Sequence, residues 1–465
     1  MIPAPSVNAM HPPLLAAANR VLTPQRLRRY PLIMFVVTVG MYMVVVVRSE
    51  NWIEPDGKII GRDFLAFYMA GAMINEGRLD HLYDFAAQTT FQQRFMADIN
   101  PLWSGVCLYR NPPHYAAALS LLTPLGYGPA LIAWWVLSGA CFAVTALLWR
   151  RWLGPGRSGV AILLAVCVPA WFWALAGGQN TFFSLLIWTG FCGLLMSGRD
   201  FRAGLVLAAL AFKFHFLVVP VGLLAFKGRW RALAGVGVGG LATLALTAAV
   251  LGPQSISDYL GFGANLGRVA QVEGFDLHKQ HSWHGFFALL GQGWLPGRGA
   301  WLLTAAATVG SLILLGSIWR GRWSPRHPRF AVQLSALVMA TLLTSPHLAH
   351  YDVLMAALPG VLWLSAAPRG QYAGVASDAV RVLLAVGFIW LAISPAVADL
   401  THVQFTPWLM LAWLLIVRRA LAEHTDGSKA GALPQRTIGG DSATVQAFTS
   451  SRVPVDRDAA ASCSA

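Results

Sequence analysis

The residue best suited to chemistry in this chain is an acid that closely follows the first long apolar run. Asp63 lies in the segment Gly-Arg-Asp-Phe-Leu-Ala-Phe-Tyr of residues 61–68, and only 20 of the 465 residues are acidic. A carboxylate at the edge of a bilayer can accept a proton from a substrate hydroxyl, as a general base does. Aspartate is also a common N-cap, so Asp63 could instead cap a helix that begins at Phe64. The residue types leave both roles open.

Lys213 is the second residue whose position calls for an explanation. It interrupts an apolar stretch, between Ala-Ala-Leu-Ala-Phe and Phe-His-Phe-Leu-Val-Val. An ammonium group at membrane depth is costly and by default suggests a functional site. Its partner would be either a substrate phosphate or a nearby structural acid, unless its aliphatic stem carries the charge to the interface.

Two pairs of histidines occur in the later polar segments. His347 and His350 are three residues apart, a spacing that shares one face of a helix, and they could hold a phosphate. Together with His281 and His284 they would offer nitrogen ligands for zinc, although the sequence places no liganding carboxylate beside them.

The composition is that of a membrane protein with many spans. Hydrophobic residues make up 56% of the chain and charged residues 12%, about half the usual charged fraction. A spanning helix needs roughly 20 apolar residues, and the chain offers about ten such runs. The net charge of +14 would suggest nucleic acid in a soluble protein. Here the basic residues lie in short clusters between apolar runs, so we expect a lipid bilayer as partner and no nucleic acid.

The basic clusters orient the chain, because arginine and lysine are enriched in cytoplasmic loops. They predict a cytoplasmic N-terminus at 1–30, a membrane domain at 31–420 and a cytoplasmic tail at 421–465. The tail is rich in Ser, Thr, Gly and Ala, so we expect it to be disordered. Two long outer loops are expected, at 48–128 and 252–299. Residues 48–111 show little sustained apolar character, and a short interfacial helix is expected at 112–125.

Residues 203–226 are expected to form a hairpin of two half-helices. Basic residues flank this segment on both sides, so a single span would place one cluster outside. Each half covers only about 16 Å, and non-helical backbone is tolerated at membrane depth where it lines a cavity. We therefore predict an all-α polytopic membrane protein with about ten full transmembrane helices and this hairpin, about twelve membrane segments in all, with Lys213 near the apex.

Six motifs in order resemble glycosyltransferase family 87 of the GT-C superfamily, over roughly residues 30–420. They are Arg62-Asp-Phe-x-x-Phe-Tyr-x-Ala-Gly71 with Leu82-Tyr-Asp84, Tyr109-Arg-Asn-Pro-Pro113, Gly178-Gln-Asn-Thr181, Ala203-Gly204 through Lys213, His281-Ser-Trp-His-Gly285, and Ser345-Pro-His347 through Tyr351-Asp352. The resemblance implies a bacterial envelope enzyme that uses a polyprenyl-phosphate-mannose donor. The chain departs from the family at Phe214-His215 and in its proline motif, which leaves the donor and acceptor open.

The resemblance also implies roles for residues. The family's catalytic base maps onto Asp63, and the groups around its carrier phosphate map onto Lys213 and His347. By charge we add His350 and Arg62 to the phosphate-binding group. The other polar residues of the outer segments are expected to line the substrate pocket: Tyr68, Asp84, Gln179, Asn180, His215, His281, Ser282 and Asp352.

The expected reaction transfers mannose or a related hexose from a polyprenyl-phosphate donor to an envelope glycolipid or glycan, at the periplasmic face of the bacterial inner membrane. A single carboxylate predicts inversion, since retention needs a second acid close by, and Asp84 lies beyond the predicted helix. No cofactor is expected, and no divalent metal is required beside Arg62 and Lys213. The alternative is a transporter or flippase for a lipid-linked sugar, for which internal repeats would be expected and none is seen.

Overall fold

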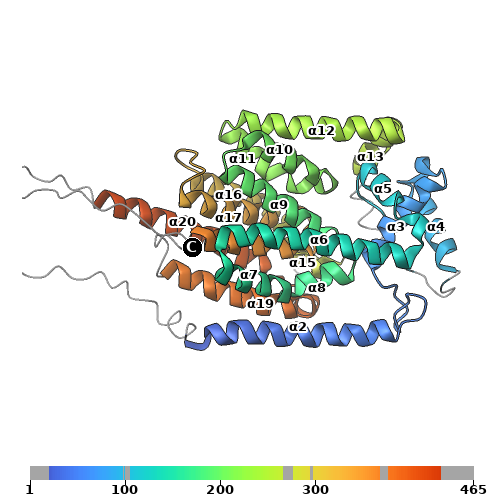
Figure 1. The fold of residues 1–465 in the computed structure, drawn as a ribbon, viewed down its shortest axis with the longest axis horizontal. Helices are drawn as coiled ribbons and strands as arrows, with labels where there is room; N and C mark the ends of the chain where they lie inside the picture. The colour runs from blue at the N-terminus through green and yellow to red at the C-terminus, as the bar shows by residue number, and fades with distance from the viewer. Residues whose placement is uncertain are drawn as a thin grey trace, which may run out of the picture. The chain divides into compact units, whose positions relative to one another are not determined.

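The computed structural model describes residues 20–97, 99, 105–264, 276–293, 297–366 and 375–430. Within these ranges the chain forms α-helices and short 3-10 helices, and its β-bridges are isolated (Figure 1). The expected all-α fold is therefore confirmed. The chain divides into two units, Met1–His424 and Thr425–Ala465, and the following description concerns the first.

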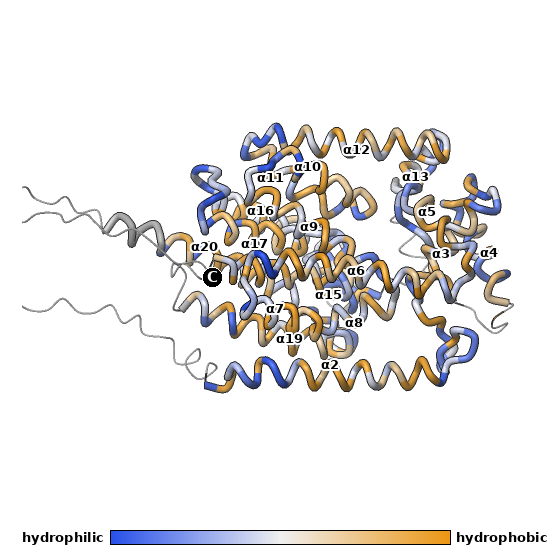
Figure 2. The backbone as a smooth tube through the Cα atoms, viewed as in Figure 1, coloured by the Kyte–Doolittle hydropathy of each residue, from blue (hydrophilic) through white to orange (hydrophobic). Residues whose placement is uncertain are grey.

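Five helices are long and apolar enough to cross a bilayer. They are α2 (Pro24–Val47), α6 (Tyr127–Leu153), α12 (Trp230–Leu251), α16 (Gly297–Ile318) and α19 (Val375–Thr401). At most 28% of the apolar window of any of them is buried within the protein, and α2 and α12 are hydrophobic along most of their length (Figure 2). Leaving that much apolar surface in water would be costly, so lipid covers it. The protein is a multi-pass membrane protein.

Three shorter apolar helices form the interior. They are α9 (Thr181–Met196), α17 (Pro328–Leu343) and α18 (Ala357–Ala366), which follows the 3-10 helix η5 (Asp352–Ala356). Every residue of α17 from Phe330 to Leu343 is buried. At 1.5 Å per residue, α17 is about 24 Å long, less than the roughly 30 Å hydrocarbon core.

The expected count of about ten full transmembrane helices is not confirmed. Five described helices qualify, or seven segments if two bent pairs are counted as one span each. One pair is α7 (Pro155–Cys167) with α8 (Pro169–Ala176), bent by 59°. Hydropathy alone cannot separate a helix buried in protein from one facing lipid. The last helix, α20 (Thr406–Ala430), continues past the predicted start of the tail at 421, while residues 431–465 lie outside the described ranges.

The second bent pair is the segment that was expected to form a hairpin. It consists of α10 (Asp200–Ala208), the 3-10 helix η3 (Ala209–Phe216) and α11 (Val218–Phe226), and it bends by 118°. Lys213 breaks the helix, with φ −131° and ψ 61°. Both ends return to the same basic side, because Arg229 after α11 forms an ion pair with Asp200 at the start of α10. The structure thus shows two half-helices with Lys213 in the break.

The segment expected to form the first outer loop contains more helix than its composition indicated. It folds into α3 (Arg62–Asn75), α4 (Phe85–Ala97), α5 (Pro113–Ser120) and the 3-10 helices η1 (Leu79–His81) and η2 (Thr123–Leu125), with α3 packed against α4 and α5. These helices have an apolar core of their own around Phe64 and Leu65. Helices α3 and α4 were not expected in this segment, whereas the short helix expected at 112–125 is present as α5 and η2.

The second segment expected to lie outside contributes α13 (Gln254–Ala264), η4 (Leu277–Lys279) and α15 (Trp283–Gly293). Gln280, after η4, forms a β-bridge with Ala349, and its side-chain oxygen accepts from the N–H of Leu348 at 3.0 Å. This contact joins the second outer segment to the loop between α17 and η5, where the later histidines lie.

Candidate active site

Asp63 is held at the start of α3, against the turn between α8 and α9. The helix begins at Arg62 after Gly61, whose φ of 73° suits glycine, and no side chain caps it. Instead the backbone N–H groups of Asp63 and Phe64 both donate to the carbonyl oxygen of Gly177, at 3.1 Å each. The backbone thus satisfies the first turn of the helix. Asp63 is not the N-cap, and its carboxylate is left for another role.

The carboxylate of Asp63 is enclosed by protein, although the residue as a whole is partly exposed. Burial raises the pKa of the Asp63 carboxyl above its usual value, while a hydrogen bond with the side chain of Gln179 and the positive charges of Arg62, Lys279 and Lys213 oppose that shift. A carboxylate with a raised pKa is a better proton acceptor. Such a group in a partly enclosed site is a candidate catalytic base.

Lys213 has an anionic partner within the protein. Its Nζ lies 2.5 Å from Oδ1 of Asp352, and the same oxygen accepts from the hydroxyl of Thr181 at 2.6 Å. Lys213 is 8% exposed and Asp352 1% exposed. Of the partners considered for Lys213, the structure shows a nearby acid, Asp352. Through Lys213 and Thr181, Asp352 connects η5 to η3 and α9. Lys213 also lies close enough to Asp63 for their charges to interact.

His347 and His350 lie in the loop between α17 and η5, not on a shared helical face as their spacing suggested. The ring of His347 lies edge-on to that of His215, with centroids 6.3 Å apart, and the ring of His350 packs on Trp173 at 4.9 Å. Burial lowers the pKa of both His347 and His350 to about 4. Both are neutral at pH 7, so they can form hydrogen bonds with a phosphate but supply no positive charge to it.

His281 and Ser282 stabilise the loop around the site. His281 is fully buried, with Nδ1 2.7 Å from the hydroxyl of Thr406 and its backbone N–H donating to Leu348 at 2.8 Å. Ser282 accepts from the N–H of Gly285 at 3.4 Å, in the first turn of α15.

The zinc arrangement considered for the four histidines is not found. No group of three or more histidine, cysteine or acidic side chains in the described ranges lies close enough together to hold a metal ion. His284 instead lines a pocket of about 310 Å³ between α15 and α16. The expectation that no divalent metal is required stays a prediction.

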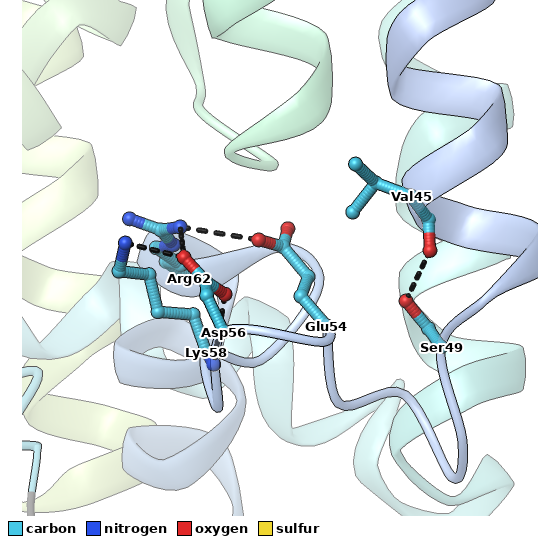
Figure 3. A network of polar contacts seen from close by, with 6 residues as sticks. All are labelled: Val45, Ser49, Glu54, Asp56, Lys58 and Arg62. Atoms are coloured by element: carbon cyan, nitrogen blue, oxygen red, sulfur yellow. Dashed lines mark hydrogen bonds and ion pairs between the residues drawn. The ribbon is translucent and has the colours of Figure 1, made fainter.

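Three residues assigned to the site from sequence have other partners in the structure. Arg62 pairs with Glu54 at 3.1 Å and with Asp56 at 3.8 Å in the loop before α3 (Figure 3). The hydroxyl of Tyr68 donates to the carbonyl of Thr123 at 3.2 Å. Asp84 caps α4, since its Oδ1 accepts from the N–H groups of residues 86 and 87. Asn180, by contrast, is buried beside Gln179 and interacts with Tyr115.

Sequence reasoning missed Arg110, Tyr351 and Lys279. The charges of Arg110 and Asp352 influence the pKa values of both Tyr351 and His347. The charge of Lys279 influences the pKa of Asp63. Arg110 lies in the Tyr109–Pro113 motif and Tyr351 in the motif that ends at Asp352, so their membership of these motifs could have identified them. Nothing in the sequence marked Lys279. The described site therefore combines Asp63, a buried lysine with its acid, and two further cations, Arg110 and Lys279, from two other segments.

A family model described as glycosyltransferase family 87 matches residues 109–346, or 238 of the 465 residues. The chain belongs to glycosyltransferase family 87. No curated protein and no solved structure matches it. As a member of this family the protein is a glycosyltransferase, an enzyme with a sugar donor and an acceptor. The matched residues include Arg110, Gln179 and Lys213 but end before His347. The roles of Asp63 and Asp352 therefore rest on geometry.

Proposed function

We propose that this glycosyltransferase transfers mannose or a related hexose from a polyprenyl-phosphate donor to an envelope glycolipid or glycan. The observation that carries the proposal is the position of Asp63. Its carboxylate, with a raised pKa, hydrogen-bonds with Gln179 and lies within electrostatic reach of the buried Lys213. A base and a cation are thus available together among apolar helices, where a lipid-linked phosphate would present its sugar.

In the proposed step Asp63 accepts the proton of the acceptor hydroxyl while that oxygen attacks the anomeric carbon. The bond from that carbon to the phosphate oxygen breaks, and polyprenyl phosphate leaves with the electron pair. Lys213, Arg110 and Lys279 stabilise the charge that develops on the phosphate, although Lys279 also pairs with the exposed Asp276 at 2.5 Å, and the neutral His347 donates a hydrogen bond. These cations make a divalent metal unnecessary in the proposed step.

We propose that the anomeric configuration is inverted. Retention needs a second carboxylate that attacks the sugar from within about 5.5 Å of the first. Asp352 is the other buried acid of the site; its Oδ1 accepts from Lys213 and Thr181, and the residue is 1% exposed. Asp63 is partly exposed and is therefore the carboxylate more accessible to a substrate, which favours direct displacement.

The proposed location is the bacterial inner membrane, with the site on the periplasmic side. Three basic clusters support this orientation because they contact one another at the opposite end of the helices. Arg229 pairs with Asp200, and Nζ of Lys227 donates to the carbonyls of Trp319 and Gly321 at 3.0 and 2.7 Å. Clustered arginine and lysine mark the cytoplasmic side.

The decisive assay follows release of free polyprenyl phosphate by the purified protein in detergent. We expect release from polyprenyl-phosphate-mannose, or from the matching glucose or galactose donor, only when acceptor is present. A flippase moves its lipid without cleaving it and would release none. Use of a nucleotide sugar in place of the lipid-linked donors would contradict the proposed donor class.

A further inference from the structure

A second pocket lies at the other end of α9 from the candidate site. It has a volume of about 550 Å³ and is lined by Arg199, Asp200, Phe201, Arg202, Arg229 and Arg231, together with a glycine. Thr181, the first residue of α9, bonds Asp352 in the site, whereas the last residues of α9 lead directly into the pocket. A helix of 16 residues is about 24 Å long, so the pocket is remote from the reacting groups.

The pocket carries uncompensated positive charge. Its single acid, Asp200, is 5% exposed and is already paired with Arg229, whose Nε donates to Oδ2 at 2.9 Å. The guanidinium of Arg229 is further fixed over the ring of Trp323, 5.1 Å from its centroid. Arg199, Arg202 and Arg231 are exposed, and in the part of the chain that the structure describes none of them forms an ion pair. Three guanidinium groups are therefore available to an anion.

Aromatic side chains place the pocket at the level of lipid headgroups. Phe201 and Trp230 adjoin pocket arginines in the chain, Phe226 lies three residues before Arg229, and the three are 42%, 71% and 67% exposed, respectively. Trp230 begins α12, whose apolar surface continues from it. Exposed aromatic residues at the ends of apolar helices are typical of the membrane–water interface.

We propose that this arginine pocket binds the phosphate of an anionic phospholipid headgroup, from the leaflet opposite the candidate site. Guanidinium groups bind phosphate oxygens through paired, charge-assisted hydrogen bonds, and basic pockets between membrane helices suit anionic headgroups. The exposed aromatic residues favour a lipid over free phosphate, because they can contact its glycerol and acyl chains. The proposal does not depend on which sugar donor the enzyme uses.

The test measures binding of short-chain ligands to the full-length protein in detergent. The probes are dihexanoyl-phosphatidylglycerol, dihexanoyl-phosphatidylcholine and inorganic phosphate, followed by microscale thermophoresis. We expect the anionic lipid to bind at least about tenfold more tightly than either of the other two. The variant Arg202→Gln/Arg231→Gln should weaken that binding about tenfold or more, which corresponds to about 1.4 kcal/mol or more.

The control is Arg322→Gln, an exposed arginine outside the pocket, at the same basic end of the protein, and it should bind the anionic lipid as the unaltered protein does. An equal loss in this control, or no loss in the double variant, would overturn the site. Equal binding of inorganic phosphate and the anionic lipid would overturn the assignment to lipid. Should the double variant unfold, Arg199→Gln gives the same test with one exposed side chain changed. Lost lipid binding with unchanged release of polyprenyl phosphate is compatible with the proposal, because the two sites are separate.

Discussion

The backbone N–H of Asp63 donates to the carbonyl oxygen of Gly177 at 3.1 Å. This bond joins the first turn of α3 to the turn between α8 and α9, and it brings the Asp63 carboxylate beside Gln179. A Cβ atom added to Gly177 would lie 3.1 Å from Oδ2 of Asp63 and 3.0 Å from the carbonyl of Trp173. Gly177 thus leaves the space that the carboxylate occupies.

Gly177→Ala should therefore lower the transfer rate with little loss of stability. The backbone at Gly177, with φ −73° and ψ −11°, suits alanine, so the new methyl group adds no backbone strain at that residue and contacts the carboxylate as well as the carbonyl of Trp173. A small displacement of a catalytic group can cost on the order of 10²-fold in rate. Initial rates and melting temperatures measure the two effects. Gly159→Ala is the matched control, because nothing lies within 4 Å of its added Cβ, and an equal loss of rate there would contradict the account.

Lys213→Met should destabilise the protein as well as impair donor use. It leaves Asp352 buried without its cation, and breaking a buried pair costs about 3–5 kcal/mol. The double variant Lys213→Met/Asp352→Asn removes the stranded charge, so we expect the melting temperature to recover in part while donor use stays lost. Recovery of activity together with stability would mean that Lys213 is only a structural partner.

The rate should fall as the pH falls, along a single acid limb that belongs to Asp63. A general base works only when deprotonated, and burial raises the pKa of Asp63 above its usual value, so activity is lost as the pH drops through that raised pKa. His347 and His350, with pKa values of about 4, should give no inflection near 6.5. The measurement is the pH profile of kcat/KM. His347→Asn should leave the limb in place, and a limb that moves with this substitution would assign it to the histidine.

Membrane orientation can be tested with single cysteines at exposed positions. Asp80 lies before α4 with its side chain 73% exposed, and Arg322 is exposed at the basic end. In intact spheroplasts an impermeant thiol reagent should label Asp80→Cys above the background of the unaltered protein, and Arg322→Cys only after permeabilisation. The reverse pattern would place the candidate site in the cytoplasm.

Local patterns predicted the parts of the fold that depend on neighbouring residues. The lysine inside an apolar run, with basic residues on both sides, indicated the hairpin, and the structure breaks the helix at Lys213. The apolar runs predicted the all-helical membrane fold. The number of full spans they predicted is not confirmed, because helices such as α17 are buried in protein and are shorter than a bilayer.

Contacts between distant segments could not be read from the sequence. The pairing of Lys213 with Asp352 and the bond from Asp63 to Gly177 depend on how separate helices pack. Asp84 and Arg62 were assigned to the site by their chemistry. In the structure Asp84 caps α4, and Arg62 pairs with Glu54 in the loop before α3. Residue type and order do not determine which polar groups share a site.

The most direct test of the central claim is the rate of Asp63→Asn. The substitution keeps the size of the side chain and removes the proton acceptor, while the backbone bonds to Gly177 remain possible. General base catalysis contributes about 10²–10⁴-fold, equivalent to roughly 3–5 kcal/mol of barrier. Asp84→Asn is the matched control, because asparagine caps a helix about as well as aspartate.

The measurement is the initial rate of acceptor-dependent polyprenyl phosphate release, taken alongside the melting temperature. We predict that Asp63→Asn loses at least about a hundredfold in rate and melts as the unaltered protein does, while Asp84→Asn stays close to full activity. Retention of more than about a tenth of the activity by Asp63→Asn, or a larger loss in Asp84→Asn, would contradict the assignment of Asp63 as the base.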